Sequence, residues 1–208
     1  MKRISETGRS QRLRIINVLK KTQGLSVAEL GVALRLSYMG VKRHCEELER
    51  QGYVDTWRRP KPIGRPEKVH RLTLKALTFF PTASNSATIA LLNAANRLYG
   101  HAAAEKLLYS VFNAKTDEYL NQIRGHTVID LARALERIRD KEGYLCELTC
   151  EEPLVLTEYH SPIYDLLTAF PLVRRLEREM MERALGVRLE RHEEMISGLY
   201  RCQFKMLT

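Results

Sequence analysis

The segment that most constrains the fold is "RRPKPIGRPEK", residues 58–68, which holds too many charges and prolines to be buried in a core. Five lysines and arginines stand against the single acid Glu67, with three prolines and a glycine between them. The adjoining stretches "YVDTW" and "KVHRLT" are rich in β-branched and aromatic residues, which favours strands. The sequence therefore predicts a β-hairpin whose loop is stiff, exposed and cationic.

Helical signals precede this hairpin. Residues 10–21, "SQRLRIINVLKK", place apolar side chains near one face of a helix and end before Gly24. A second helix is predicted from Ser26, because Glu29 three residues later completes a capping box. In that motif the hydroxyl and the carboxylate each accept a hydrogen bond from a backbone amide that has no partner in the helix.

A third helix is predicted in "SYMGVKRHCEELERQG", residues 37–52. Ser37 is a capping residue, Val41, Cys45 and Leu48 recur on one face, and Gly52 ends the helix. We interpret Cys45 as a small core residue. Three helices followed by a hairpin are the order of a winged helix-turn-helix, so we assign residues 1–78 to such a DNA-binding domain.

In this domain the third helix and the hairpin loop are the predicted contacts with double-stranded DNA. At 100° per residue, Met39 and Arg43 lie opposite the Val41 face and are predicted to enter the major groove, with Arg43 on a base and Tyr38 and Lys42 on the backbone. Proline stiffens the loop, and its cations neutralise phosphates. The predicted DNA-binding residues are Ser37, Tyr38, Met39, Gly40, Lys42, Arg43, Arg58, Arg59, Lys61, Arg65 and Lys68.

Two alternatives remain open for these residues. The loop is also what a charged, solvated linker between domains looks like, and Arg43 is placed to pair with Glu47 one helical turn away. The charge distribution favours the DNA interpretation. Residues 1–78 hold 18 Lys and Arg against 7 Asp and Glu, a net charge of +11, whereas the remainder of the chain carries −2 of the total of +9.

Residues 79–100 contain a stretch, "SATIALLNAANRLYG", that is apolar around most of a helical circumference and must be covered on more than one side. We assign residues 79–100 to a helical linker or dimerisation segment. Burial against a second copy and packing within one chain both satisfy the pattern. Two further helices are predicted at 102–123 and 127–142, the second capped by Thr127.

After Gly143 the apolar period changes to two, which predicts strands in "YLCELTCE" and "YRCQFKM", with weaker strands in "LVLTEY" and "VRLERHE". Helices are predicted after Pro162 and Pro171, the second ending at Gly186. Residues 101–208 are therefore predicted to form an α+β domain for effector binding or dimerisation, and the chain as a whole is assigned to the α+β class.

The chain is expected to be cytoplasmic. Its start, "MKRISETGRS", lacks the apolar stretch of a signal peptide, and no run reaches the roughly 18 apolar residues of a membrane span. Its four cysteines, too scattered for a disulfide framework, are then expected to be reduced.

Several motifs resemble the iron–sulfur-sensing winged-helix repressors of the SufR type, nearly from end to end. The resemblance rests on "GRPEKVHRLT", "EYHSPI", "FPLVRRLE", "LGVRLER" and "GLYRCQF". It implies a dimeric, sequence-specific DNA-binding regulator, cytoplasmic, whose C-terminal domain senses a ligand. Two positions where that family has cluster cysteines are Ser161 and Arg174 here, a third cysteine is missing, and only Cys202 stands where the family has one. Serine and arginine are poor ligands for an iron–sulfur cluster, so no cofactor is expected.

Cys146, Cys150, His160 and Cys202 are the remaining metal-competent residues. Cys146 and Cys150 are four residues apart on a predicted strand, about 13 Å at ~3.3 Å per residue, which is too far for one ion, and both are predicted to be core thiols. His160 with Cys202 is the one candidate pair. The alternative function is a metal- or iron–sulfur-dependent redox sensor or enzyme that uses these four residues, but no nucleophile-and-base pair supports an enzyme. The expected function is a homodimeric transcriptional regulator, a repressor, that responds to a small-molecule effector and has no membrane partner.

Overall fold

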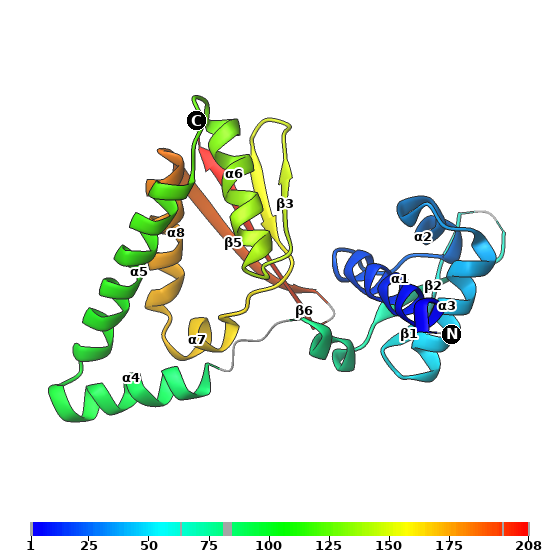
Figure 1. Cartoon of the computed structure of the whole chain (residues 1–208), viewed down its shortest axis with the longest axis horizontal. Helices are drawn as coiled ribbons and strands as arrows, with labels where there is room; N and C mark the ends of the chain where they lie inside the picture. Colours follow the sequence, from blue (N-terminus) through cyan, green and yellow to red (C-terminus); the bar gives the residue numbers. More distant parts are fainter. Residues whose placement is uncertain (1, 63, 81–84, 197, 208) are drawn as a thin grey trace. The chain divides into compact units, whose positions relative to one another are not determined.

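The structure, a computed structural model, describes residues 2–62, 64–80, 85–196 and 198–207. The described residues divide into two compact units (Figure 1). The first unit comprises Met1–Phe80 with Ile196–Leu199, and the second comprises Pro81–Met195 with Tyr200–Thr208. Each unit has a core of its own.

The first unit holds the predicted helices and hairpin in the predicted order. Its elements are α1 (Lys2–Lys20), α2 (Val27–Leu34), α3 (Tyr38–Arg50), β1 (Val54–Arg59), β2 (Glu67–Leu72) and the short 3-10 helix η1 (Leu74–Phe79). Its core gathers apolar side chains from every helix of α1–α3, including Ile15, Leu19, Leu30, Val41 and Leu48. The α+β class predicted for the chain is confirmed.

Local signals explain where these helices begin. The Ser26 hydroxyl accepts a hydrogen bond from the Glu29 amide, and the Ser26 amide donates to the Glu29 carboxylate at 2.7 Å, which completes the predicted capping box of α2. The Ser37 hydroxyl caps α3 by accepting from the amide of Gly40. Helix α3 ends at Arg50, two residues before Gly52, whose φ of +76° suits a residue without a Cβ.

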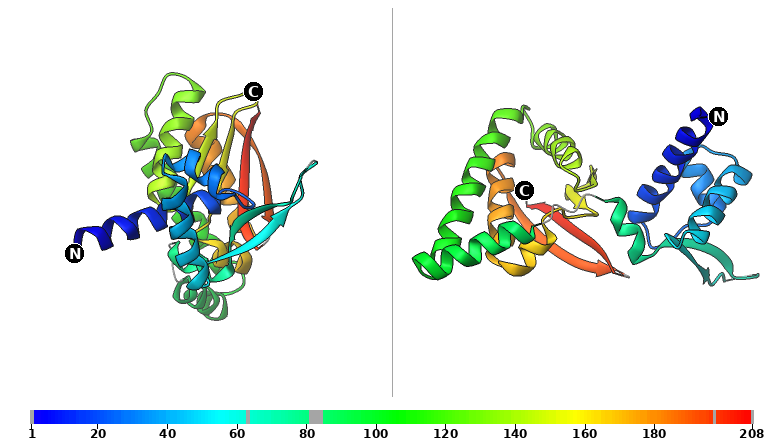
Figure 2. Two further views of the ribbon diagram at one scale, coloured as in Figure 1. Left: turned by 90° about the vertical axis from the view of Figure 1, so that its right-hand side faces the viewer. Right: turned by 60° about the horizontal axis from the view of Figure 1, so that its bottom comes forward.

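Strands β1 and β2 pair antiparallel, from Val54 opposite Leu72 to Arg59 opposite Glu67. Leu25, in the segment before α2, adds an antiparallel bridge to His70 and so ties the hairpin to the helices. The hairpin projects beyond α1–α3 (Figure 2). The predicted hairpin is therefore joined to the helical part of the unit through β2.

The second unit packs helices on one face of an antiparallel sheet with strand order β3-β4-β6-β5. Its elements are α4 (Ser86–Tyr99), α5 (Ala103–Gln122), α6 (Val128–Lys141), β3 (Cys146–Thr149), β4 (Val155–Glu158), α7 (Tyr164–Ala169), α8 (Leu172–Leu185), β5 (Arg188–Ile196) and β6 (Leu199–Leu207). Along β6 the predicted alternation is confirmed, because Cys202, Phe204 and Met206 are buried in the core with α5, α6 and α8. The predicted capping residue Thr127 is also confirmed, in a capping box with Asp130.

One expectation about the second unit is wrong, and another is met only in part within the single chain. Cys150 is exposed rather than a core thiol, because β3 ends at Thr149 and the alternation stops with it. Helix α4 packs on α5 and α7, yet within it only Leu92 is buried, whereas Leu91 and Leu98 are exposed. The expected cover on more than one side is thus not supplied by the described part of the chain.

A network of buried charges crosses the core of this unit. Arg139, only 2% exposed, donates to both oxygens of Glu158 at 2.6 and 2.9 Å and to Glu177 at 2.6 Å. Arg191 approaches the other oxygen of Glu177 at 3.4 Å. The Tyr144 ring stacks on the Arg139 guanidinium, with its centroid 3.3 Å from Cζ. Each buried charge thus has a partner of opposite charge. These ion pairs link α6, β4, α8 and β5.

Candidate nucleic-acid interface

Helix α3 divides into a buried face and an exposed one, as predicted. Cys45 is fully buried beside Val41 and Leu48, and burial, with the nearby charge of Glu49, raises its pKa to about 12, so the thiol stays neutral. On the other side Tyr38 is 58% and Met39 is 68% exposed. Large apolar side chains in solvent at the start of a helix are typical of a surface that meets a partner.

Lys42 and Arg43 are exposed on the same side of α3 as Tyr38 and Met39. The alternative partner for Arg43, Glu47, is engaged elsewhere: it accepts hydrogen bonds from Arg50 at 2.7 and 3.0 Å and lies 3.9 Å from Arg12. Arg43 is therefore exposed on the side of α3 away from the core, and its contact with DNA stays a prediction.

The turn between α2 and α3 sets the angle of this surface. Arg35 adopts a left-handed conformation with φ of +54°, and the Leu36 amide donates to the Gly31 carbonyl at 3.0 Å, which closes the end of α2. The Arg14 side chain of α1 donates to the Leu34 carbonyl at 3.1 Å. Helix α3 itself packs on both α1 and α2.

The cations of the hairpin fall into two groups. Arg58 and Arg65 are exposed, with Arg65 next to Gly64 in the loop. Arg59 instead bridges Glu29 at 2.7 Å and Glu67 at 2.8 Å, so it ties the hairpin to the start of α2. Its guanidinium is the largest cause of the lowered pKa of Glu67.

Lys61 and Lys68 have weaker partners, Glu67 at 3.5 Å and Glu49 at 3.5 Å. Exposed pairs of this length contribute little and exchange easily with another anion. The structure thus presents Arg58, Arg65 and these lysines at the surface, while Arg59 has a structural partner on each side.

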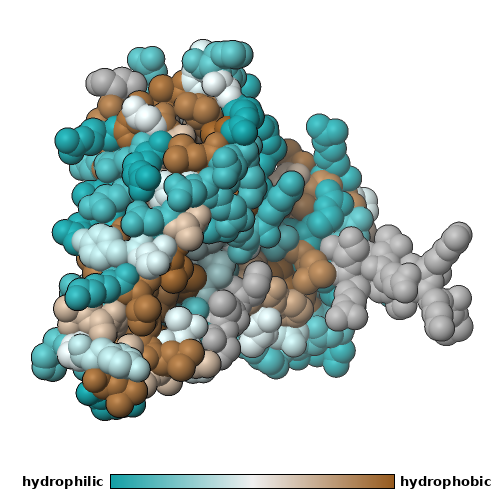
Figure 3. All heavy atoms as spheres, turned by 60° about the vertical axis from the view of Figure 1, so that its left-hand side comes forward, coloured by the Kyte–Doolittle hydropathy of each residue, from teal (hydrophilic) through white to brown (hydrophobic). Residues whose placement is uncertain are grey.

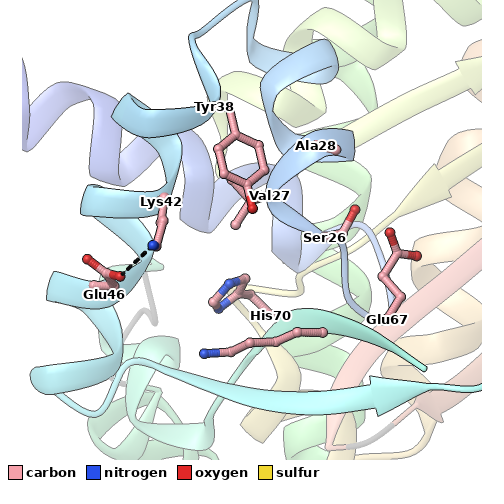
Figure 4. Close-up of a pocket in the computed structure, with 9 residues that line it drawn as sticks. Ser26, Val27, Ala28, Tyr38, Lys42, Glu46, Glu67 and His70 are labelled. Carbon is pink, nitrogen blue, oxygen red and sulfur yellow. Dashed lines mark ion pairs between the residues drawn. The ribbon is translucent and has the colours of Figure 1, made fainter. Parts of the chain in front are cut away.

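Helices α2 and α3 and strand β2 enclose a cavity of about 240 Å³ (Figure 4). It brings together Tyr38, Lys42 and Lys68 of the predicted set. His70, which the sequence did not single out, also lines it, and its side chain is 3% exposed. Burial, together with the charge of Lys68, lowers the pKa of His70, whereas Glu49 and Glu46 oppose that shift. In the sequence, the only signal that could have singled out His70 was its position beside Val69 in a predicted strand.

The candidate metal residues lie in the second unit. His160 and Cys202 are both buried, and Cys202 is opposite Glu158 in the sheet. Within the described residues no three His, Cys, Asp or Glu side chains are grouped closely enough to hold a metal ion. Burial raises the pKa of Cys202 and of Cys146, so both are neutral thiols in the metal-free chain.

The residues at the family's cluster positions do not fit an iron–sulfur cluster. The Arg174 guanidinium donates to both oxygens of Glu193 at 3.0 and 3.1 Å and to the Leu167 carbonyl. The Ser161 side chain is buried, and among the described groups its hydroxyl has no partner. A cationic side chain and a hydroxyl supply no thiolate for iron.

A larger cavity, of about 450 Å³, lies among α5, α6, α7 and α8. Its walls are mostly apolar and include Phe112, Ile163, Leu166 and Met180. Its polar side is formed by Tyr119, Arg139, Tyr144 and the Lys115–Glu142 ion pair, 2.6 Å long. Volume and lining are those of small-molecule sites.

Comparison with protein families matches residues 9–55 to the family described as winged helix-turn-helix DNA-binding. This region is a winged helix-turn-helix DNA-binding domain. The match covers α1 from residue 9, all of α2 and α3, and the start of β1, which are the elements that position the exposed face of α3. None of the curated proteins matches the sequence.

Among solved structures the chain is similar to two mutants of ZitR from Lactococcus lactis. The first, a cysteine-to-serine mutant, is 18% identical with a TM-score of 0.30, over 53% of this chain and 74% of that one. The second, a double mutant in apo form, is 18% identical with a TM-score of 0.31, over 56% of this chain and 87% of that one. Similarity this low carries no argument about the fold or the function of this chain. No helix among the described residues is long and apolar enough to cross a membrane.

Proposed function

We propose that this chain is a sequence-specific DNA-binding transcriptional regulator that acts as a homodimeric repressor. The observation that carries the proposal is the exposed cationic surface of the winged-helix domain, where Arg43 on α3 and Arg58 and Arg65 on the hairpin face solvent. A net charge of +11 in residues 1–78 attracts a polyanion, and the family of this domain binds DNA.

The second unit supports the homodimer. Figure 3 turns this side of the molecule forward and has hydrophobic side chains at its surface among hydrophilic ones. Helices α4 and α5 carry exposed large apolar residues, which are Leu91, Leu98, Tyr99, Leu107, Val111 and Leu120. A surface of this kind is typical of a protein interface. Sedimentation of the purified chain is expected to give a dimer, and Leu98→Glu together with Val111→Glu is expected to give a monomer.

The cavity of about 450 Å³ supports an effector site in the same unit. Apolar walls with a few polar groups suit a small, mostly apolar molecule. Replacing Ala114, which lines the cavity, with Trp is expected to fill it and to abolish any thermal stabilisation by compounds that stabilise the wild type.

The experiment that tests the function is selection of bound fragments from genomic DNA with purified protein. The proposal predicts enrichment of a short motif with two-fold symmetry, and reporter expression from the enriched promoter that rises when the regulator is deleted. Enrichment of no sequence would contradict sequence-specific binding, and a fall in reporter expression would contradict repression. The redox alternative predicts a coloured protein with bound iron after anaerobic purification, and no observation in the described structure favours it.

A further inference from the structure

The polar side of the larger cavity, in the second unit, holds an ammonium group of the chain itself, that of Lys115. The Lys115 Nζ atom lies 2.6 Å from a Glu142 oxygen and 3.0 Å from a Glu118 oxygen. It also lies 5.1 Å from the centre of the Tyr119 ring, which is a cation–π distance. Two carboxylates and an aromatic ring around one nitrogen are suitable surroundings for a positively charged amine.

The Glu142 carboxylate is held in place by groups other than Lys115. Its second oxygen accepts a hydrogen bond from the Tyr119 hydroxyl at 2.5 Å, and that hydroxyl accepts one from Arg139 at 3.5 Å. Tyr119 and Arg139 are both buried. Glu142 is also the C-cap of α6, where the carbonyl end of the helix carries partial negative charge. The carboxylate therefore keeps its position when Lys115 moves.

The lining of the cavity has one negative charge in excess. Glu118 and Glu142 share the single ammonium of Lys115. Arg139 does not compensate them, because its charge is neutralised by its two buried carboxylate partners. Burial lowers the pKa of Lys115, but its hydrogen bonds to Glu142 and Glu118 outweigh that effect, and the pKa is raised. The cavity thus favours the charged form of an amine.

Lys115 is able to give up its contact with Glu142. Its side chain is 34% exposed, and the flexible four-carbon stem lets the ammonium stay with Glu118, which is also exposed, on the solvent side. A second ammonium at Glu142 would then give each carboxylate a cation of its own. An apolar group attached to that ammonium would lie against the apolar walls, where α5 and α8 lie side by side (Figure 1).

We propose that the ligand of this cavity is a small apolar molecule with a positively charged amine, and that the amine binds Glu142 in place of Lys115. The inference rests on the proposed effector site and names its class of ligand. Lys115 acts as a built-in competitor for Glu142. A neutral molecule of the same size gains the apolar contacts alone, and an anionic one adds to the negative charge of the lining.

Three probes that share one apolar chain test the class of ligand. They are octylamine, octanol and octanoate, which are positive, neutral and negative at neutral pH. Calorimetric titration of the full chain is expected to give about tenfold weaker binding for octanol than for octylamine, and weaker binding again for octanoate. Ala114→Trp, which fills the cavity, is expected to abolish binding of octylamine.

Two substitutions with opposite signs test the place of the amine. Glu142→Gln keeps an acceptor for Tyr119 but removes the charge, and it is expected to weaken octylamine about tenfold and octanol less than twofold. Lys115→Met removes the competitor and is expected to tighten octylamine about three- to tenfold. The matched control is Lys106→Met, an exposed lysine on the same helix, which is expected to change binding less than twofold. Far-ultraviolet circular dichroism verifies that each variant folds.

The outcomes separate the ligand class from the proposed function. The inference is overturned, while the effector site stands, if octanol binds as tightly as octylamine or if Lys115→Met leaves octylamine binding unchanged. It is also overturned if no probe binds the wild type or Lys115→Met. Octylamine that binds with the expected selectivity but leaves the affinity for the selected DNA fragment unchanged would contradict the effector role and leave the ligand class standing.

Discussion

The two units of this chain use arginine in opposite ways. In the winged-helix domain Arg43, Arg58 and Arg65 are exposed, and the domain carries a large excess of positive charge. In the second unit Arg139 is buried against Glu158 and Glu177, in a near-neutral part of the chain. An exposed cation without a strong ion pair is available to bind a partner, whereas a buried and paired cation contributes only to the fold.

The largest effect expected from this contrast is on stability. Arg139→Met leaves two buried carboxylates poorly compensated and is expected to lower the free energy of unfolding by about 3–5 kcal/mol. Arg137→Met, an exposed position on the same helix, is expected to change it by less than about 0.5 kcal/mol. Urea unfolding followed by circular dichroism measures both.

A further substitution sharpens this test. Replacing Glu158 and Glu177 with Leu in the Arg139→Met background removes the unpaired charges and is expected to recover much of the lost stability. Equal stability of the Arg139→Met and Arg137→Met variants would show that the buried network contributes nothing to the fold.

The next effect is on DNA affinity. Arg43→Ala is expected to weaken binding to the selected sequence by about 1–3 kcal/mol and binding to random DNA much less, because we propose that its side chain contacts a base. Arg58→Ala is expected to weaken both alike, since we propose that it neutralises a phosphate. Fluorescence anisotropy with the two duplexes separates the roles, and Arg188→Ala, exposed in the second unit, is the control. If each of the two variants loses affinity for the selected and the random duplex by the same factor, the distinction between a base contact and a phosphate contact is contradicted.

The smallest predicted effect is a pH dependence of the winged-helix domain. The pKa of His70 is lower in the folded protein than its usual value of about 6.5, mainly through burial. Below pH 6.5 the unfolded state therefore binds a proton that the folded state does not, and stability falls as the pH drops. Between pH 7 and pH 5 we therefore expect the free energy of unfolding to fall, with His70 contributing part of the loss.

Urea unfolding followed by Trp57 fluorescence reports this domain, since Trp57 lies in β1. His70→Asn is expected to flatten part of the pH dependence. His44→Gln removes the separate contribution of His44, whose pKa burial also lowers. An unchanged slope in His70→Asn would contradict the assignment.

Local signals in the sequence were enough to predict much of the fold. The Ser26–Glu29 and Thr127–Asp130 capping boxes each span only four consecutive residues, and they mark where α2 and α6 begin. The alternation around Cys202 gave the buried face of β6. These features depend on neighbours in the chain, so no tertiary information was needed.

The structural features that the sequence did not predict depend on contacts between residues far apart in the chain. Arg139 meets Glu158 and Glu177 from 19 and 38 residues away, and no local pattern marks a buried charge. His70 is buried directly after buried Val69 in a strand on which α1 packs, and an alternating pattern does not predict two consecutive buried residues. Cys150 followed the apolar period of β3 but stands one residue beyond its end.

The candidate site also has features that the sequence predicts and features that only the fold reveals. Composition located the cationic hairpin, but it did not distinguish Arg59, which bridges Glu29 and Glu67, from its neighbour Arg58. The two residues differ only in what the fold brings near them.

The most direct test of the central claim is the salt dependence of duplex binding by the full chain. If a dimer neutralises about 6–10 phosphates, the affinity falls by about 10³–10⁵-fold between 50 and 200 mM salt. A variant with Arg43, Arg58 and Arg65 all changed to Ala is predicted to bind more weakly and to lose about one unit of log–log slope for each phosphate contact removed. No binding at 50 mM salt, or the same slope in the variant as in the wild type, would contradict the account.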